Sequence, residues 1–540
     1  MQVEFVLLIL SLLFFVSIFA DKIGYRFGVP ALLLFLIVGM LFGSGGMTSL
    51  IGIKGGVTID TGIAQALSTM AMCIILFTGG METKFSEIKS VLAPGITLAT
   101  VGVILTCAIT GVIIYFLFGW INAVYTMSMW TAFLTAATMS STDSASVFSV
   151  LRTNGVGLKH NLRPLLELES GANDPMAYVL TSTLIGVVVS RYAAGGEAVP
   201  IEALPIIQNI LIQLVMGTVL GFVFGQGIVA LMRRVKLGNE ALYPIMILTA
   251  CIFIFSVTYY LKGNTYLAVY VGGLIIGNNK FTRKRQTRSF FNGLAWLSQL
   301  VMFLMLGLMV QPSELINPKV WLPCLIISLV MICISRPLSV LLCMLPFRDQ
   351  YRQRDRLFLS WVGLKGAVPI IFAIMCKAGG VPHADMIFNV VFLCTLVSLL
   401  MQGTTLAPIA RKLSLATPPE KVHTLEHFDL DLPEEIQSSA REVEVTEKHL
   451  ANGNTLREIA IPPKTLIVMV RRGEDFFVPT GSSTLELGDQ LLVISDKDAE
   501  ESYQHMMNDA EEDALWRAEV RRKAQERFAK AVSWMHRKNN

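Results

Sequence analysis

Long apolar segments recur along the chain from residue 3 to about residue 411, and polar loops separate them. A helix needs about 20 mostly apolar residues to cross the roughly 30 Å of hydrocarbon in a bilayer. Hydrophobic residues make up 53% of the chain and charged residues only 16%, and soluble domains carry about 25% charged residues. We therefore predict an all-α polytopic membrane domain over residues 1–412 with about thirteen spanning helices. The predicted spans are 3–20, 29–46, 63–81, 92–118, 124–150, 163–190, 204–232, 240–261, 265–278, 291–311, 320–345, 357–376 and 385–410.

Basic residues alternate between the predicted loops and so test this segmentation. The odd-numbered loops together hold nineteen Lys and Arg residues, and the even-numbered loops hold five. Loops that are rich in Lys and Arg tend to stay in the cytoplasm. Because the alternation runs without exception, it indicates an odd number of spans. We predict a multi-pass protein of the cell (inner) membrane, with its N-terminus outside and its C-terminus in the cytoplasm.

The chain changes character after Lys412. Residues 413–436 are polar and contain Pro418-Pro419, which is typical of a linker. Residues 437–497 predict a small cytoplasmic α+β domain, and residues 498–540 predict a charged tail that is helical or partly disordered. Four short runs with strand composition lie in the small domain, at 442–446, 466–470, 476–478 and 490–494.

An acid and several hydroxyls lie in the middle of the fifth predicted span, in the run Ser140-Ser-Thr142-Asp143-Ser-Ala-Ser146. Ionisable groups inside a membrane are costly and indicate function by default. Such a run suits a broken helix whose free carbonyls and carboxylate line a water-filled site. The alternative is an intact, packed helix in which Ser and Thr bond to their own backbone.

A second polar cluster, Glu169-Ser170-Gly-Ala-Asn173-Asp174-Pro175, lies in the sixth predicted span. On a helix, Ser170 and Asp174 share one face, so both can point at one bound ion. Oxygen ligands of this kind suit hard cations. Burial disfavours the charged form of a carboxylate, which allows it to exchange a proton near neutral pH. We predict that a cation and a proton compete for Asp174.

Two basic residues lie in later spans and can balance these acids. Arg336, in the eleventh span, needs an acidic partner if it is buried, and we expect that partner to be Glu169. Lys365 lies in Gly363-Leu-Lys-Gly-Ala-Val-Pro369, whose Gly and Pro residues predict a second broken helix. The Lys365 ammonium can neutralise the C-terminal ends of half-helices; the alternative is that it snorkels to the cytoplasmic rim.

The two predicted interruptions lie in spans five and twelve, which are seven helices apart and so cross in opposite directions. Interrupted helices related in this way are typical of inverted repeats that meet at a mid-membrane site.

These motifs together resemble the monovalent cation:proton antiporter family, which includes the bacterial NhaP-type sodium or potassium/proton antiporters and the animal sodium/proton exchangers. The resemblance covers residues 1 to about 412. It rests on Thr142-Asp143, on Glu169-Ser170-x-x-Asn173-Asp174-Pro175, on Arg336-Pro-Leu-Ser-Val-Leu and on Gly363-Leu-Lys-Gly-Ala-Val-Pro369. Lys365 departs from the family pattern, since many members carry Arg at this position, but it keeps the positive charge.

The resemblance implies a homodimer with thirteen spans in which a core bundle moves against a dimerisation scaffold. It also implies that Asp174 is the exchanging carboxylate and that the cation binds Asp143, Thr142, Ser170 and Asn173. The Glu169–Arg336 pair would be a structural bridge. Asn before the Asp implies electroneutral one-for-one exchange.

The segment after the membrane domain resembles the C-terminal lobe of the regulator-of-potassium-conductance fold, the TrkA-C type. The matching residues are Leu456-Arg-Glu-Ile-Ala-Ile461, Val478-Pro-Thr-Gly481 and Leu485-Glu-Leu-Gly-Asp489-Gln-Leu-Leu-Val-Ile494. Such lobes dimerise and often sense small ligands, which implies gating by a nucleotide or an ion. Joined to a transporter, the lobe favours K⁺ as the exported cation, with Na⁺ as the alternative.

Several other functions are less consistent with these residues. A potassium channel would need a filter of the T-V-G-Y-G kind, and none is present. An anion symporter would present cationic or hydroxyl-rich groups to its substrate, not Asp143 with Asp174. A purely structural or sensor role leaves the buried acids unexplained. The sequence has no phosphate-binding loop or metal-ligand spacing, so we expect neither an enzyme nor a resident cofactor, and no nucleic-acid partner.

Overall fold

The computed structural model describes residues 8, 11–19, 31–43, 59–120, 127–194, 203–235, 237–311, 317–417, 440–445, 450, 453–457, 465–473 and 475–495. The chain divides into two compact units, Met1–Pro419 and Glu420–Asn540. The division falls inside the predicted linker. The predicted tail, residues 498–540, lies outside the described residues.

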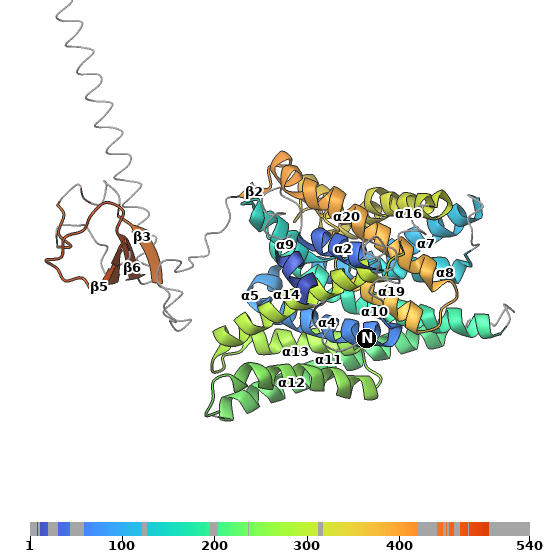
Figure 1. Cartoon of the computed structure of the whole chain (residues 1–540), viewed down its shortest axis with the longest axis horizontal. Coiled ribbons are helices and arrows are strands. Elements are labelled where there is room, and N and C mark those ends of the chain that lie inside the picture. Colours follow the sequence, from blue (N-terminus) through green and yellow to red (C-terminus); the bar gives the residue numbers. More distant parts are fainter. Residues whose placement is uncertain are drawn as a thin grey trace, which may run out of the picture. The chain divides into compact units, whose positions relative to one another are not determined.

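The first unit is built of helices (Figure 1). The helices of its N-terminal half are α2 (Ala31–Phe42), α4 (Thr61–Glu82), α5 (Phe85–Ile88), α6 (Leu92–Thr97), α7 (Val103–Trp120), α8 (Met129–Thr138), α9 (Ser144–Thr153), α10 (Leu162–Ala193) and α11 (Ala203–Arg234). The others are α12 (Leu242–Tyr260), α13 (Thr265–Asn278), α14 (Lys284–Met309), α16 (Pro318–Val330), α17 (Arg336–Cys343), α18 (Gln353–Trp361), α19 (Val368–Ala378) and α20 (Ala384–Lys412). Short π-helical turns at Leu98–Gly102 and Met331–Ser335 join α6 to α7 and α16 to α17.

Eight helical segments in the described part of the chain are long and apolar enough to cross a membrane, and α2, α13 and α19 are shorter apolar helices. The helices fall in the predicted segments. The helical segments Phe85–Trp120 and Lys284–Met309 each begin seven residues before the predicted starts at 92 and 291. At α14 the basic first turns continue the helix beyond the apolar stretch. The mostly helical membrane architecture is therefore confirmed, and the count of thirteen spans stays a prediction.

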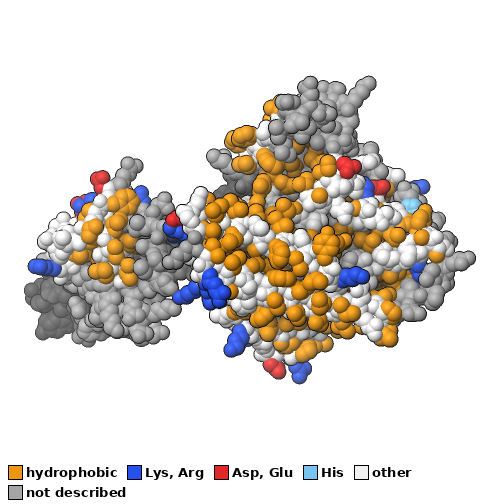
Figure 2. Space-filling view, turned by 90° about the horizontal axis from the view of Figure 1, so that it is seen from below, with side chains coloured by type: hydrophobic (Ala, Val, Ile, Leu, Met, Phe, Trp, Pro, Cys, Tyr) orange, Lys and Arg blue, Asp and Glu red, His pale blue; other side chains and the backbone are white. Residues whose placement is uncertain are grey.

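Many large apolar side chains face outward from the first unit. Phe116, Val215 and Phe253, for example, are 67%, 60% and 50% exposed. Hydrophobic side chains cover much of the described surface in the view of Figure 2. Soluble monomers rarely expose apolar patches of this extent, whereas a surface in contact with lipid requires them.

Both predicted helix interruptions are present. Residues 139–143 separate α8 from α9, and residues 362–367 separate α18 from α19. The two non-helical segments touch, because the backbone N–H of Asp143 donates to the carbonyl of Leu364 at 2.9 Å. Non-helical backbone at membrane depth is tolerated where it is buried in protein or lines a cavity. The contact between the interruptions therefore places the candidate site.

Close packing of glycines brings α4 and α13 together beside α11 and α12, as Figure 1 shows. The predicted span at 265–278 is present as α13. A Cβ atom at Gly80 would overlap the carbonyl oxygen of Tyr270, and one at Gly273 would overlap that of Phe77. Small residues allow this approach between helices inside a membrane, where association depends on van der Waals packing.

The end of the first unit is fastened to the loop between α9 and α10. Strand β1 (Gly157–Leu158) pairs antiparallel with β2 (Ala416–Thr417), which follows α20. The N–H of Lys159 also donates to the carbonyl of Leu415 at 3.1 Å. The chain that leaves the membrane domain is thus hydrogen-bonded to the loop that follows α9, the helix that begins at the first interruption.

The second unit contains an antiparallel four-stranded sheet in the order β3-β6-β4-β5. Its strands are β3 (Ala440–Glu444), β4 (Thr465–Arg472), β5 (Asp475–Phe477) and β6 (Gln490–Ser495), which overlap all four predicted strands. Val445, Val470, Leu485 and Leu491 form its apolar core. The described residues of this unit form strands and turns, so the helical part of the predicted α+β domain stays a prediction.

Adjacent glycines on α4 provide a test of the helix contact. We expect Gly80→Ala to destabilise the detergent-solubilised protein by about 1–3 kcal/mol, because the added methyl group overlaps backbone. Gly79→Ala is the matched control, since a Cβ at Gly79 has open space and Ala is the better helix former. Thermal unfolding measures both. Equal midpoints for the two variants would contradict the packing.

Because of the Asp489 carboxylate, we expect the sheet of the second unit to lose stability at acidic pH. Burial by itself would raise the pKa of Asp489, but the Arg472 hydrogen bonds, the Glu486 N–H and the guanidinium charge outweigh it and lower that pKa. Because the pKa of Asp489 is lower in the folded than in the unfolded state, its carboxylate stabilises the fold at pH values above the unfolded pKa of about 3.9. This stabilisation is lost as the pH falls through the folded pKa.

We expect Asp489→Asn to speed hydrogen exchange of the β4 and β6 amides in the full chain at neutral pH. The free energy of opening the sheet should fall by about 2 kcal/mol. The difference from the parent should begin to shrink below about pH 4, the unfolded value, and vanish as pH falls through the lowered pKa of the folded carboxylate. Hydrogen exchange with mass spectrometry measures this. A difference that persisted at low pH would show that Asp489 acts through shape and not charge.

Candidate functional site

Asp143 is the last residue of the first interruption and the N-cap of α9. Its carboxylate accepts hydrogen bonds from the backbone N–H of Ser146, at 3.2 Å, and from the Ser146 hydroxyl. The side chain thereby satisfies donors that the start of a helix leaves free. A Cβ atom at Gly366 would overlap the Asp143 carboxylate, so only glycine allows the second interruption to approach this closely.

Asp174 lies in the middle of α10 and is 6% exposed. Its Oδ1 atom has no hydrogen-bond partner among the described residues. A buried carboxylate without a partner is unfavourable as a bare anion. It is therefore suited to hold either a proton or a cation.

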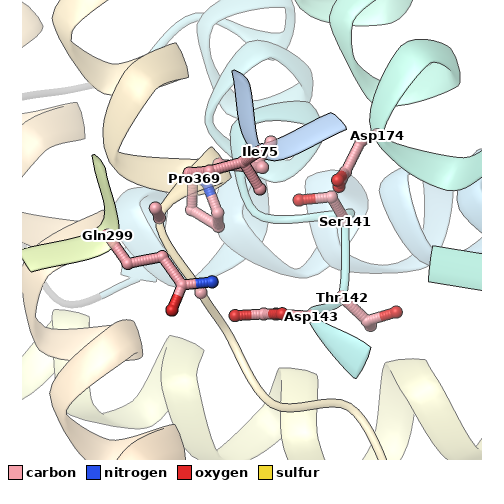
Figure 3. Close-up of a pocket in the computed structure, with 10 residues that line it drawn as sticks. Ile75, Ser141, Thr142, Asp143, Asp174, Gln299 and Pro369 are labelled. Carbon is pink, nitrogen blue, oxygen red and sulfur yellow. The ribbon is translucent and has the colours of Figure 1, made fainter. Parts of the chain in front are cut away.

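A cavity of about 20 Å³ lies between the two acids. A polar cavity of this size holds about one water molecule. Figure 3 shows the carboxylate of Asp174 beside the hydroxyl of Ser141 on one side, and Asp143 on another. Its lining residues are Ile75, Ser141, Thr142, Asp143, Asp174, Gln299, Gly366, Ala367, Val368 and Pro369.

Lys365 provides a cation next to this cavity. Its side chain is 2% exposed, and its ammonium group donates to the carbonyl of Ser141 at 2.8 Å. The expectation that Lys365 balances the end of a half-helix agrees with this contact, since Ser141 follows α8. The alternative, a side chain that reaches the cytoplasmic rim, is excluded by its burial.

The family resemblance implies that Ser170, Asn173 and Thr142 are all cation ligands, but in the structure their positions relative to the cavity differ. Thr142 lines the cavity, whereas Ser170 and Asn173 do not. The Ser170 hydroxyl donates to the Thr142 carbonyl at 2.8 Å and accepts from the Ser144 N–H at 3.0 Å. Asn173 donates to the Thr142 hydroxyl at 2.7 Å. Both side chains hold the interruption in place because its backbone groups lack helical partners.

The structure brings Glu169 and Arg336 together. Glu169 lies on α10, five residues before Asp174. The guanidinium Nη2 lies 2.5 Å from the carboxylate Oε1, and the side chains are 5% and 1% exposed for Arg336 and Glu169. The contact is a close ion pair without the angles of a hydrogen bond, since Oε1 and Oε2 have no hydrogen-bond partner among the described residues. Arg336 also donates to the carbonyl of Val362 at 3.3 Å, which ties the pair to the second interruption.

Helix α20 supports the second interruption from behind. The Lys365 N–H donates to the Ser398 hydroxyl at 3.0 Å, and that hydroxyl donates to the Gln402 side chain at 2.6 Å. Gln402 in turn donates to the carbonyl of Trp361 at 2.7 Å. These contacts account for two of the buried polar residues of α20.

Sequence reasoning missed Gln299, and it named Ser141 only as part of a hydroxyl run. Both line the cavity. A signal for Gln299 was available, because it is a single amide within the apolar run Leu297-Ser-Gln-Leu300 of a predicted span. The sequence alone could not show that this face of α14 lines the same cavity as Asp143.

The arrangement can bind one small cation or one proton between two carboxylates, with one buried ammonium nearby. Among the described residues, no group of His, Cys, Asp and Glu side chains could hold a metal ion in the manner of a metalloprotein. The oxygen atoms and carboxylates at the cavity wall are groups that can bind a hard cation or a proton reversibly.

Comparison with known families assigns both parts of the chain. Residues 8–412 match the model of the transmembrane sodium/hydrogen exchanger family. Residues 440–508 match the model of the TrkA-C domain. The first match covers the membrane helices and all of the candidate site residues.

Relatives with assigned names cover most of the chain. The K(+)/H(+) antiporter NhaP of Alkalimonas amylolytica is 37% identical over 500 residues, which are 91% of this chain and 81% of that protein. The K(+)/H(+) antiporter NhaP2 of Shewanella sp. (strain MR-4) is 35% identical over 508 residues, 94% of this chain and 83% of that protein. The Na(+)/H(+) antiporter NhaP of Pseudomonas aeruginosa is 27% identical over 374 residues, 66% of this chain and 83% of that protein.

A solved structure shares the fold of the membrane unit. The sodium proton antiporter MjNhaP1 from Methanocaldococcus jannaschii superimposes with a TM-score of 0.63 at 20% identity, over 76% of this chain and 99% of that one. Together with the family model and the relatives above 30% identity, this fold shows where the chain belongs. It is a member of the sodium/hydrogen exchanger family with a TrkA-C domain in its C-terminal part.

Proposed function

We propose that the protein exports K⁺ in exchange for an entering proton, one for one, by alternating access at Asp174. The observation that carries the proposal is the unpartnered Asp174 oxygen at the wall of a polar cavity that holds about one water molecule. This carboxylate either carries a proton or neutralises a bound cation. Because one charge replaces the other, each complete cycle moves no net charge.

Four further residues support binding of the cation in this proposal. Asp143 and Thr142 line the cavity and supply oxygen atoms, which hard cations prefer. Ser170 and Asn173 act through Thr142, whose carbonyl and hydroxyl they hold. The proposal thus assigns these two a positioning role in the state described by the structure.

The choice of K⁺ rests on the relatives. Those at 35–37% identity over more than 90% of the chain are named K(+)/H(+) antiporters. The relative that is named a Na(+)/H(+) antiporter is 27% identical and matches 66% of the chain. Na⁺ is the second candidate because the same oxygen ligands serve both ions.

The proposal includes a homodimer of subunits with thirteen spans each, in the cell inner membrane. The alternation of basic loops supports an external N-terminus and a cytoplasmic C-terminus. The TrkA-C domain then lies in the cytoplasm, where a nucleotide or an ion could regulate transport through it. The β1–β2 pairing supports this coupling, since it fastens the start of the linker to the loop after α9.

Family membership favours antiport over the channel and anion-symporter alternatives. A channel has no use for a buried carboxylate that must alternate between two ligands. An anion would meet two carboxylates at the wall of this cavity.

Asp174→Asn tests the exchange mechanism. We expect exchange to fall at least 100-fold with KCl, NaCl or LiCl, because an amide can neither take up a proton nor neutralise a cation. The measurement is dye-reported proton movement in everted vesicles. If exchange is electroneutral, the parent should exchange at the same rate whether or not the membrane potential is collapsed.

Asp385→Asn is the matched control for that experiment. Asp385 pairs with Lys377 and its side chain is 69% exposed, so the change should leave exchange intact. Normal exchange by Asp174→Asn would contradict the mechanism. The relative rates of the parent with the three salts separate K⁺ from Na⁺ as the substrate.

The Glu169–Arg336 pair is proposed to be structural. Glu169→Gln leaves a buried guanidinium without its counter-ion, so we expect a loss of about 3–5 kcal/mol in thermal unfolding of the solubilised protein. A double variant, Glu169→Gln with Arg336→Met, should lose less than the single change. Glu240→Gln is the control, since its Arg283 pair is exposed and should contribute little. Additive losses in the double variant would argue against a pair.

A further inference from the structure

Gln299 is a polar residue of α14 that the proposed mechanism does not yet use. It is half-buried, lies ten residues before the end of a 26-residue helix, and belongs to the lining of the cavity. Figure 3 shows its amide end directed toward the carboxylate of Asp143. The side chain thus approaches the acids from a helix that carries neither of them.

The Gln299 amide makes no hydrogen bond with any of the residues that the structure describes. The neighbouring Ser298 is a contrast, since its hydroxyl donates to the Leu294 carbonyl of its own helix at 2.8 Å. Ser298 is satisfied within its own helix, whereas Gln299 is one of the polar side chains that line the cavity.

The chemistry of an amide suits the cation in this cavity. Carbonyl oxygens of Asn and Gln are ligands for hard cations, as carboxylates are. A cavity with room for about one water molecule forces an ion to shed most of its hydration shell, so the walls must replace the lost oxygens. An amide adds an oxygen without adding charge, which leaves the one-for-one exchange at Asp174 unchanged.

We propose that Gln299 is a ligand of the transported monovalent cation and helps to set its affinity. This inference rests on the proposed function, since it assigns a further ligand to the same site. It differs from the assignment of Asp143 and Thr142 in its origin, because Gln299 comes from α14 and not from the interrupted helices.

The test compares Gln299→Met, which keeps a similar length without the amide, with Gln299→Asn and with Ser298→Ala as the control. The first readout is the concentration of K⁺ or Na⁺ that gives half of the cation-induced thermal stabilisation of the purified protein. The second is the apparent KM and the maximal rate of exchange in vesicles.

We expect Gln299→Met to raise the half-saturating concentration and the KM about tenfold, the effect of one lost contact to a charged group. The maximal rate should stay within about twofold, because ligand loss weakens binding and leaves Asp174 in place. Gln299→Asn, which keeps a shorter amide, should be intermediate, and Ser298→Ala should match the parent.

Unchanged cation binding in Gln299→Met would overturn the assignment. So would a loss of intrinsic thermal stability and maximal rate at unchanged KM, which would indicate a structural role. Because the binding readout needs no transport, failure of the exchange mechanism would appear separately, as a parent that binds the cation but does not exchange it.

Discussion

Where a helix is interrupted at membrane depth, its free backbone groups must form hydrogen bonds within the protein. The whole site depends on which groups supply these bonds. The two interruptions are each other's partners: the Asp143 N–H donates to Leu364, and the Lys365 ammonium donates to the Ser141 carbonyl. Helix α20 adds two contacts here: Ser398 accepts from the Lys365 N–H, and Gln402 donates to the carbonyl of Trp361 at the end of α18. Since neither interruption is satisfied alone, the crossing is a single cooperative unit, and the cavity forms where the two do not fill the space between them.

Charge is distributed around this crossing so that most of it is already engaged. Glu169 is paired with Arg336, Asp143 caps α9, and Lys365 is held by a carbonyl. Asp174 differs, because it lines the cavity and its Oδ1 atom has no hydrogen-bond partner among the described residues. A site in which one carboxylate is left free can hold one exchangeable positive charge at a time, and this is the physical basis of the proposed competition between a cation and a proton.

The periodic features of the sequence predicted much of the fold. Apolar length located the helices, and the Gly and Pro residues of 363–369 identified an interruption. Strand composition located the four strands of the second unit. Each of these signals is local, since it depends on the solvent that a segment meets or on the conformations that its own residues allow. The helix count and the orientation in the membrane need the bilayer itself and stay predictions.

By itself, the sequence determined which chemistry is available: a buried acid in α10, a second acid at an interruption, and two buried cations to balance them. Only the tertiary structure decided which groups meet. Helical spacing places Ser170 beside Asp174 but does not show that its hydroxyl is already bound to Thr142. It gives no reason to select Gln299, which reaches the cavity from α14. The reason is physical, because spacing along a helix defines a face, and only packing between helices defines what that face contacts.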